Sequence, residues 1–171
     1  MIDEEEYVDI VDEHDNVIGK DTKENKYSKG LISRNVVIFV LDKENNLLIT
    51  KRSPQKKTYP NKYDVSAVGN VKSGEKPEQA AKRELEEELN INCEVNFAGK
   101  IFLEFFDSNI MLRYYTYVFL GTYDGEIVLG TELTEHQKIP LKDVEKLVNR
   151  NKDQFTPGFL KDFELVKEHL K

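Results

Sequence analysis

The sequence has 171 residues, of which 39% are hydrophobic and 10% aromatic, and its formal net charge is −7. A chain of this length is typical of one compact domain, so we expect residues 1–171 to form a single domain. The negative charge disfavours nonspecific binding to nucleic acid, whose phosphates are neutralised by clustered lysine and arginine. The apolar residues form runs too short to cross a bilayer, so no membrane span is predicted.

The first residues and the cysteine content indicate a cellular compartment. Residues 3–6 are all acidic, which is unlike the basic and then apolar start of a secretory signal. The single cysteine, Cys93, cannot form an internal disulfide and is expected to pack rather than react. We therefore expect a cytoplasmic protein.

Apolar and aromatic runs separated by polar turns predict a chain rich in β-strands. The predicted strands are residues 7–11, 17–20, 35–41, 47–50, 63–68, 94–106 and 109–120, with a further short strand at 126–129. The first two should pair as a hairpin, because the residues between them are polar and turn-forming. Residues 21–33 are polar, show no clear period and receive no predicted element. Residues 1–30 are thus predicted to be an N-terminal β extension.

Helical patterns occur at three places. Over residues 77–89, apolar side chains recur at four-residue intervals and form one stripe. The other two predicted helices, 141–148 and 158–170, each follow a proline. Thr156 and Pro157 suit the N-cap and the first helical position of the last one. Strands followed by helices predict an α/β protein.

Three acidic residues of the helix at 77–89 are spaced so that they meet. Glu84, Glu87 and Glu88 stand at i, i+3 and i+4, so their carboxylates share one side of the helix. Like charges at this spacing destabilise an isolated helix by about 0.2–0.5 kcal/mol per pair, so compensation by a cation is expected. A glutamate-rich helical face is more often simply solvated. Carboxylate clusters that do bind an ion suit hard divalent cations such as Mg²⁺ or Mn²⁺.

The residues around this cluster follow a longer pattern, from residue 69 to residue 91. Its fixed positions are Gly69, Glu75, Arg83, Glu84, Leu85, Glu87, Glu88, Asn90 and Ile91. This order and spacing resemble the Nudix box of the MutT-like Nudix hydrolase superfamily. The one departure is Asn90, where the box has a glycine. Asparagine is the other residue that accepts the left-handed conformation at a helix C-terminus, so the departure is physically mild.

The resemblance implies a fold and an activity. The fold is an α/β/α sandwich with a mixed β-sheet, here with the N-terminal β-hairpin as an extension. The activity is that of a pyrophosphohydrolase: the three box glutamates bind Mg²⁺ and take part in cleaving a diphosphate linkage in a small molecule of the nucleoside diphosphate-X type. The resemblance also implies that Glu75 and Arg83 orient the glutamates and that Gly69 permits the strand-to-loop turn.

Members of this superfamily take their general base either from the box or from a later loop. Glu132 and Glu135 lie in the corresponding region, ahead of residues 139–141, which resemble the closing strand of the family. We favour Glu132 as the catalytic base. The alternative for either carboxylate is an exposed loop position without a catalytic role.

Several cationic side chains outside the box are candidates for binding substrate phosphates. Arg52 ends a predicted strand, Lys56 and Lys57 follow in the next loop, and Arg113 lies in a later strand. Arginine offers two parallel donors to a phosphate and lysine a point charge. Aromatic residues between positions 102 and 117 could stack a base, but alternating aromatics in strands are usually core, and we assign them no role.

Two other functions compete with hydrolysis. The N-terminal extension and residues 30–34 resemble the Nudix subgroup of isopentenyl-diphosphate isomerase. That enzyme has a cysteine and a histidine beside the first box glycine and a histidine before the arginine of the 30–34 segment, where this chain has Val68, Asn70 and Ser33. Valine cannot transfer a proton, and asparagine and serine replace a histidine ligand poorly, so isomerisation is disfavoured.

The other competing function is a module that binds a diphosphate ligand without cleaving it. Such a module would be expected to lose the glutamates, which this chain keeps. Whether the protein hydrolyses, isomerises or only binds its ligand, the expected partner is a small diphosphate compound. A homodimer through the open edge of the hairpin at residues 7–20 is a further hypothesis.

Overall fold

The computed structural model describes residues 6–170, so the acidic start of the chain lies outside the described residues. The strands are β1 (Tyr7–Val11), β2 (Val17–Thr22), β3 (Ile32–Leu41), β4 (Asn46–Arg52), β5 (Tyr63–Asp64), β6 (Ala67–Asn70), β7 (Val95–Asp107), β8 (Ile110–Thr122) and β9 (Leu133–Pro140). The helices are α1 (Lys23–Lys29), α2 (Pro77–Leu89), α3 (Leu141–Arg150) and α4 (Pro157–Leu170), with a short 3₁₀ turn at Lys152–Gln154.

Strand β3 lies at the centre of a mixed seven-stranded sheet. It pairs parallel with β8 and antiparallel with β6, while β7 extends the sheet on the far side of β8. Beyond the turn after β3, β4 pairs antiparallel with β5 and β9. Residues 36–40 of β3 are at most 2% exposed. The continuous apolar run in the sequence therefore corresponds to a strand covered on both faces.

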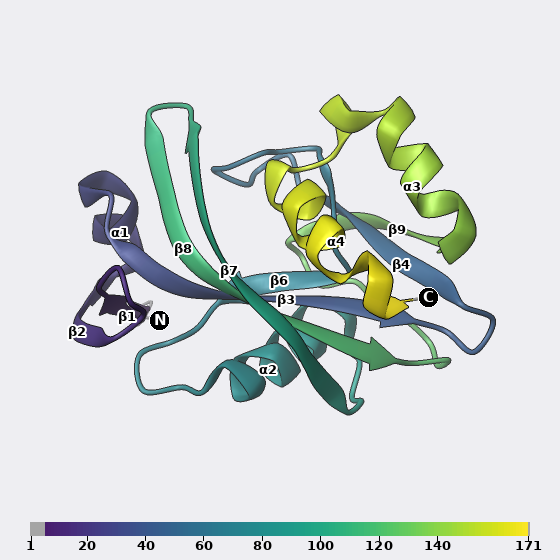
Figure 1. The fold of residues 1–171 in the computed structure, drawn as a ribbon, viewed down its shortest axis with the longest axis horizontal. Coiled ribbons are helices and arrows are strands. Elements are labelled where there is room, and N and C mark those ends of the chain that lie inside the picture. The colour runs from purple at the N-terminus through teal and green to yellow at the C-terminus, as the bar shows by residue number, and fades with distance from the viewer. Residues whose placement is uncertain (1–5, 171) are drawn as a thin grey trace.

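Helices cover both faces of this sheet (Figure 1). The apolar stripe of α2 packs into one core, in which Ala81, Leu85 and Leu89 are fully buried. Helices α3 and α4 form the other core, where Phe159 lies 6.1 Å from Phe39 between ring centroids. The apolar side chains of residues 36–40 in β3 thus alternate between two cores, and the predicted α/β/α sandwich is confirmed.

The predicted N-terminal hairpin is present as a separate two-stranded sheet, β1–β2. Its turn is anchored to the domain by Asp15, whose carboxylate accepts hydrogen bonds from Arg34 Nε at 2.7 Å and Lys100 Nζ at 3.0 Å and from the hydroxyl of Tyr117. Within residues 6–170, strand β2 pairs with β1 alone, and the Ile18 side chain on it is 67% exposed. Association through this edge remains a hypothesis.

Helix α1 lies within residues 21–33, for which no element is predicted from the sequence. Its N-terminus is capped by Thr22, whose Oγ1 accepts from the Asn25 N–H at 3.1 Å. Its C-terminus is Gly30, which adopts the left-handed conformation with φ 62°. Both caps are visible in the sequence, but the helix buries only Lys26 and therefore has no apolar stripe to reveal it.

The region between β8 and α3 also differs from the prediction. Residues 126–129 form no strand, and the strand of this region is β9, which starts at Leu133. Most side chains of β9 are polar and exposed, because the strand pairs only with β4 at the margin of the sheet. Glu135 consequently lies within this strand and not ahead of it. The predicted strand at 63–68 is likewise divided into β5 and β6.

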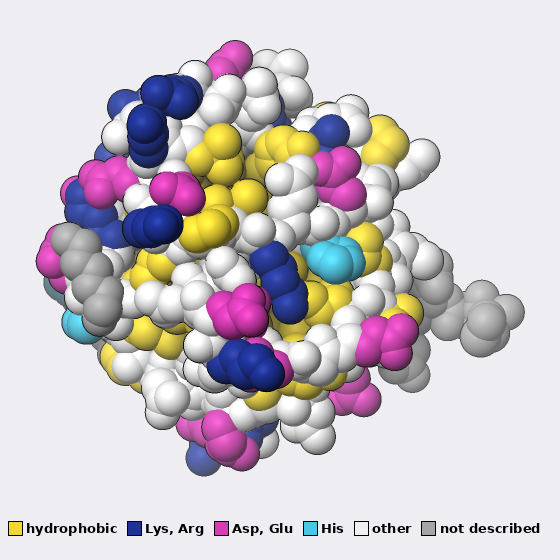
Figure 2. Space-filling model, turned by 90° about the vertical axis from the view of Figure 1, so that its right-hand side faces the viewer, with side chains coloured by type: hydrophobic (Ala, Val, Ile, Leu, Met, Phe, Trp, Pro, Cys, Tyr) yellow, Lys and Arg dark blue, Asp and Glu magenta, His cyan; other side chains and the backbone are white. Residues whose placement is uncertain are grey.

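The helices and the surface of the described residues can be compared with two classes of partner, membranes and nucleic acid. None of the helices within residues 6–170 is long and apolar enough to cross a membrane. On the face shown in Figure 2, lysine and arginine side chains are interspersed with acidic ones and do not gather into one area. That face therefore presents no broad cationic surface of the kind that attracts nucleic acid.

Candidate functional site

Helix α2 carries the glutamate cluster, and both of its ends are fixed. At its start, the Gln79 side chain accepts a hydrogen bond from the backbone N–H of Lys76 at 2.9 Å. At its end, Asn90 adopts the left-handed conformation with φ 55°, as predicted from the sequence. The Asn90 side chain also donates to the Val128 carbonyl at 2.6 Å. Asparagine thus ties the following loop to the helix, which a glycine at this position could not do.

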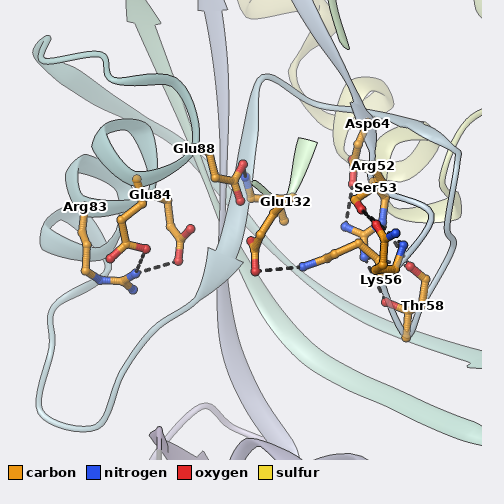
Figure 3. Close-up of polar contacts among 12 residues, drawn as sticks. Arg52, Ser53, Lys56, Thr58, Asp64, Arg83, Glu84, Glu88 and Glu132 are labelled. Carbon is orange, nitrogen blue, oxygen red and sulfur yellow. Dashed lines mark hydrogen bonds and ion pairs between the residues drawn. The ribbon is translucent and has the colours of Figure 1, made fainter. Parts of the chain in front are cut away.

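That loop carries Glu132 to the glutamate cluster. The Gly130 N–H donates to the Glu88 carbonyl at 2.8 Å, so the backbone of the loop lies directly against the last turn of α2. A Cβ atom at Gly130 would lie 2.4 Å from the Glu87 carbonyl oxygen, so no larger residue fits there. The chain then brings Glu132 between the box glutamates and the loop that follows β4 (Figure 3).

Arg83 connects the acidic residues of the box. Its Nε and Nη2 donate to both carboxylate oxygens of Glu75, at 2.8 and 3.1 Å. Its Nη1 donates to Glu84 at 2.7 Å and to Glu87 at 3.2 Å. Glu75 is itself held by the Lys72 N–H at 2.9 Å. Arg83 thus links Glu75, Glu84 and Glu87 through hydrogen bonds.

Gly69 is required for space and not for a turn. It lies within β6, paired with Val36 of β3, and its φ is not positive. A Cβ atom at this position would lie 2.1 Å from the carboxyl carbon of Glu84. The absence of a side chain therefore lets Glu84 press against the backbone of β6. This differs from the strand-to-loop turn that the resemblance implies.

Two of the box glutamates are nearly buried. Glu84 is 7% exposed and Glu88 is 5% exposed, whereas the Glu87 side chain is 54% exposed. Burial raises the pKa of Glu84 to about 7, although Arg83 acts in the opposite direction. Burial also raises the pKa of Glu88 well above its usual value, and the charges of Glu84 and Glu132 add to this effect. Negative charge is therefore costly here unless a cation is supplied.

This cost predicts how the stability of the metal-free protein depends on pH. The pKa of Glu84 is 4.5 in the unfolded reference and about 7 in the fold, so the folded state binds more protons between these values. The stabilisation is fully present below the unfolded pKa and is lost as the pH rises through the folded one, by an amount on the order of 3 kcal/mol. Urea unfolding at about pH 5 and about pH 8 measures this difference.

The Glu84→Gln variant should show a clearly smaller difference between the two pH values. Glu86 is the matched control, because it is exposed on the same helix, and Glu86→Gln should behave as the natural protein does. A Glu84→Gln variant with an undiminished pH dependence would contradict the assignment.

The glutamates line one side of a cleft of about 640 Å³. Arg52 and Lys56 lie on the other side, and Glu132 lies between, with its Oε1 3.4 Å from Lys56 Nζ (Figure 3). Lys57 also lines the cleft. Arg52 is held in place by two hydrogen bonds to the Thr58 carbonyl, at 3.1 and 2.8 Å. Lys57 is 70% exposed and pairs with Glu24 across the cleft mouth. Acidic and basic groups thus face each other across one space.

Two predicted site residues do not join this cleft. Arg113 lies outside it, where its Nε donates to Glu104 at 2.8 Å and its Nη1 to the Gly30 carbonyl at 3.3 Å. The structure therefore gives no support to Arg113 as a substrate-binding residue. Glu135 accepts a hydrogen bond from the Tyr63 hydroxyl at 2.7 Å and does not line the cleft either.

Lys26 is a cleft residue that the sequence analysis did not single out. It is 2% exposed, and its ammonium donates to Asn70 Oδ1 at 2.6 Å. Burial lowers its pKa to about 7. Asn70 stands where the isomerase has a histidine, so in this chain an ammonium group, rather than a metal-binding imidazole, occupies that corner of the cleft. Only the two caps of α1 could have indicated that Lys26 is fixed there.

The donor set of the cluster suits a hard divalent cation, since it consists of carboxylate oxygens. In the present geometry, however, no three carboxylate, imidazole or thiol side chains within residues 6–170 are grouped closely enough to hold a metal ion. Arg83 Nη1 instead lies 2.7 Å from a carboxylate oxygen of Glu84 and 3.2 Å from one of Glu87.

The sequence is similar to one family model and to several known proteins. Residues 32–162 match the family model described as the NUDIX domain. The chain is 34% identical to an uncharacterised Nudix hydrolase of Yersinia pestis, over 94% of this chain and 85% of that protein. It is 31% identical to isopentenyl-diphosphate Δ-isomerase 2 of Photorhabdus laumondii, over 92% of this chain and 90% of the isomerase.

Among solved structures, the fold is similar to that of a Deinococcus radiodurans protein, with a TM-score of 0.70 and 24% identity over 85% of this chain and 90% of that one. The family match covers the seven-stranded sheet, the box and the start of the last helix, and it includes Glu75, Glu84, Glu87, Glu88 and Glu132. The chain therefore belongs to the Nudix hydrolase family.

Proposed function

We propose that the protein is a Mg²⁺-dependent pyrophosphohydrolase that cleaves the diphosphate linkage of a nucleoside diphosphate-X compound. The observation that carries the proposal is the division of one cleft into two chemical sides. Buried carboxylates that need a cation lie opposite arginine and lysine side chains that can bind phosphate oxygens. A cleft of about 640 Å³ also has the size of sites that hold small organic ligands.

We assign a part in this reaction to the following residues of the box. Glu84, Glu87 and Glu88 would hold Mg²⁺, with Mn²⁺ as the alternative. When bound, the metal supplies positive charge to the phosphate oxygens and makes a coordinated water more acidic. Glu75 and Arg83 would hold the glutamate carboxylates in position, and Gly69 leaves room for Glu84.

The remaining groups act on water and substrate. Glu132, held at the centre of the cleft by Lys56, would accept the proton of the attacking water. Arg52 and Lys57 would bind the phosphates, Arg52 from a position fixed by hydrogen bonds and Lys57 with an exposed side chain. A lysine or arginine on the leaving phosphate stabilises the charge that it gains.

The test is product release from a panel of diphosphate compounds, with and without Mg²⁺. It compares the natural protein with a Glu87→Gln, Glu88→Gln double variant and with Glu132→Gln. We expect turnover that needs the metal and is lost in the double variant, and a decrease of about 10²- to 10⁴-fold in Glu132→Gln if this residue is the base. Binding of a compound without turnover by the natural protein would instead favour a diphosphate-binding module.

The 31% identity with an isomerase makes isomerisation the second candidate. The structure disfavours it at the positions that carry that reaction. Asn70 is engaged by Lys26, Val68 has no titratable group, and Ser33 is fully buried in β3. Incubation with isopentenyl diphosphate and Mg²⁺ should therefore give no dimethylallyl diphosphate, and formation of that product would overturn the hydrolase proposal.

A further inference from the structure

The N-terminal hairpin lies beside the segment that joins β6 to helix α2 (Figure 1). This segment, residues 71–76, is the box loop, since it connects the strand of the first box glycine to the helix of the box glutamates. Val8 of β1 forms an antiparallel bridge with Lys72 of the box loop. Strand β1 therefore pairs with β2 on one edge and contacts the box loop on the other. The matched family segment starts at residue 32, so the hairpin lies outside it.

Hydrogen bonds fix the box loop to β1. The Ser73 N–H donates to the Tyr7 carbonyl at 2.8 Å. The Asp9 carboxylate accepts twice, through Oδ1 from the Ser73 hydroxyl at 2.8 Å and through Oδ2 from the Gly74 N–H at 3.3 Å. Gly74 has φ 79°, a conformation that favours glycine, so the loop turns at the point where Asp9 binds it. One carboxylate thus engages two successive residues of the turn.

The hairpin is itself fixed to the domain. Its inner strand is packed, because Val8 is fully buried and Val11 is 2% exposed. Its turn is held by the hydrogen bonds of Asp15 to residues of β3, β7 and β8 described above. Asp9 stands in the packed strand, ahead of this anchored turn. A carboxylate on such a strand is placed more precisely than one on a loop.

From the box loop, further contacts lead to the glutamate cluster. The two residues that Asp9 binds directly precede Glu75 in the chain. The Glu75 carboxylate accepts from the Lys72 N–H at 2.9 Å, and the Glu75 N–H donates to the Lys72 carbonyl at 2.9 Å. Glu75 also accepts the two hydrogen bonds of Arg83. Asp9 therefore holds the middle of a short turn whose last residue binds Arg83.

The bond between Glu75 and Arg83 determines which nitrogen of the guanidinium meets the glutamates. Glu75 engages Nε and Nη2 of Arg83, and Nη1 donates to Glu84 and Glu87. Arginine and a carboxylate pair most strongly through two parallel hydrogen bonds. An Arg83 released by Glu75 would be free to pair in this way with Glu84 or Glu87. It would then compete with a cation for their oxygens, so the position of Glu75 affects metal binding.

We propose that Asp9 is a positioning residue for the metal site and that the N-terminal hairpin supports the box loop. This inference rests on the proposed function, because it concerns the same glutamates. Asp9 does not line the cleft. It acts through the turn at residues 73–74, then through Glu75, and finally through Arg83. The support comes from a part of the chain that the family segment, residues 32–162, does not contain.

Amide hydrogen exchange of the metal-free protein tests the support of the loop without metal or substrate. In Asp9→Ala, exchange at Ser73 and Gly74 should be about 10-fold faster, because their turn loses a charged acceptor. Exchange in the buried strand β3 should stay natural, which shows that the domain remains folded. Natural exchange at both loop amides in Asp9→Ala would overturn the proposal.

Equilibrium binding of Mn²⁺ without substrate, followed by electron paramagnetic resonance of the free ion, tests the effect on the site. The affinity should be about 10-fold weaker in Asp9→Ala, as is typical when an outer partner of a metal ligand is removed. Asp9→Asn keeps one acceptor oxygen and should lie between Asp9→Ala and the natural protein. The matched control is Glu13→Ala, which removes an exposed acid from the same hairpin and should bind Mn²⁺ as the natural protein does. Its bond to the Tyr115 hydroxyl uses the backbone carbonyl and is kept.

A second background separates positioning from a general loss of structure. If Asp9 acts through Glu75, Asp9→Ala should weaken Mn²⁺ binding little further in a Glu75→Gln protein, because the path is already interrupted. The same loss in both backgrounds, or an unchanged affinity in Asp9→Ala, would refute the positioning role.

The failure of this inference is distinguishable from the failure of the proposed function. Metal-dependent hydrolysis with natural Mn²⁺ affinity in Asp9→Ala would leave the hydrolase and refute the role of Asp9. A natural protein that neither binds Mn²⁺ nor hydrolyses any compound would refute the proposed function, and the positioning role with it.

Discussion

Replacing Glu88 by glutamine should lower kcat/KM for diphosphate hydrolysis by about 10³-fold without weakening the metal-free fold. Glu88 is 5% exposed, so water cannot easily take the place of its carboxylate as the proposed ligand. Glutamine keeps the size of the side chain and one carbonyl oxygen, but it removes the negative charge that attracts the metal. Because the charge of Glu88 is disfavoured by burial and by Glu84, the free energy of unfolding without metal should stay equal or rise at neutral pH.

The measurement combines steady-state kinetics at saturating Mg²⁺ with urea unfolding in a chelator. Glu86→Gln removes the same charge from an exposed position two residues away, and this variant should keep natural activity and stability. Activity and metal-free stability together show whether Glu88 acts as a metal ligand or supports the fold. A loss of activity accompanied by a large loss of metal-free stability would mean that Glu88 serves the fold, and an active Glu88→Gln variant would remove it from the metal site.

The box shows why the centre of the site could be predicted from sequence. The bounds of α2 and the left-handed Asn90 follow from local rules, namely helical period, proline at the start and a residue that accepts positive φ at the end. The same period places three carboxylates on one side of the helix. Each of these features depends on residues at most a few positions apart, so one sequence suffices to reveal them.

The rest of the cleft depends on contacts between distant segments. Lys26 meets Asn70 across 44 positions, and Asp162 and Asp64 approach each other only because α4 packs over the sheet. No local pattern marks such residues, since an isolated lysine or aspartate in a polar stretch is usually exposed. Arg113 is the opposite case, a residue that was predicted in the cleft and lies outside it. Its position in a strand does not tell which face of the sheet its side chain lies on or which group it contacts.

Glycine 69 provides the second large expected effect. In Gly69→Ala, the new methyl group would lie 2.1 Å from the carboxyl carbon of Glu84, which Arg83 and burial hold in place. Either the carboxylate or strand β6 must move. Because a displacement of about 1 Å in a catalytic group can cost about 10²-fold in rate, we expect a decrease in kcat/KM of at least this size. Overpacking should also lower the free energy of unfolding by about 1–3 kcal/mol.

Gly19→Ala is the matched control, since a Cβ atom at Gly19 would have no heavy atom within 4 Å. It should leave kinetics and urea midpoint unchanged. In Gly69→Ala, the apparent affinity for Mg²⁺ should weaken together with kcat/KM, because the displaced group is a proposed ligand. If the rate fell while metal affinity stayed natural, the methyl group would be acting on the substrate and not on Glu84. An unchanged Gly69→Ala enzyme would show that Glu84 has room to retreat, and that its contact with the β6 backbone is not needed for the reaction.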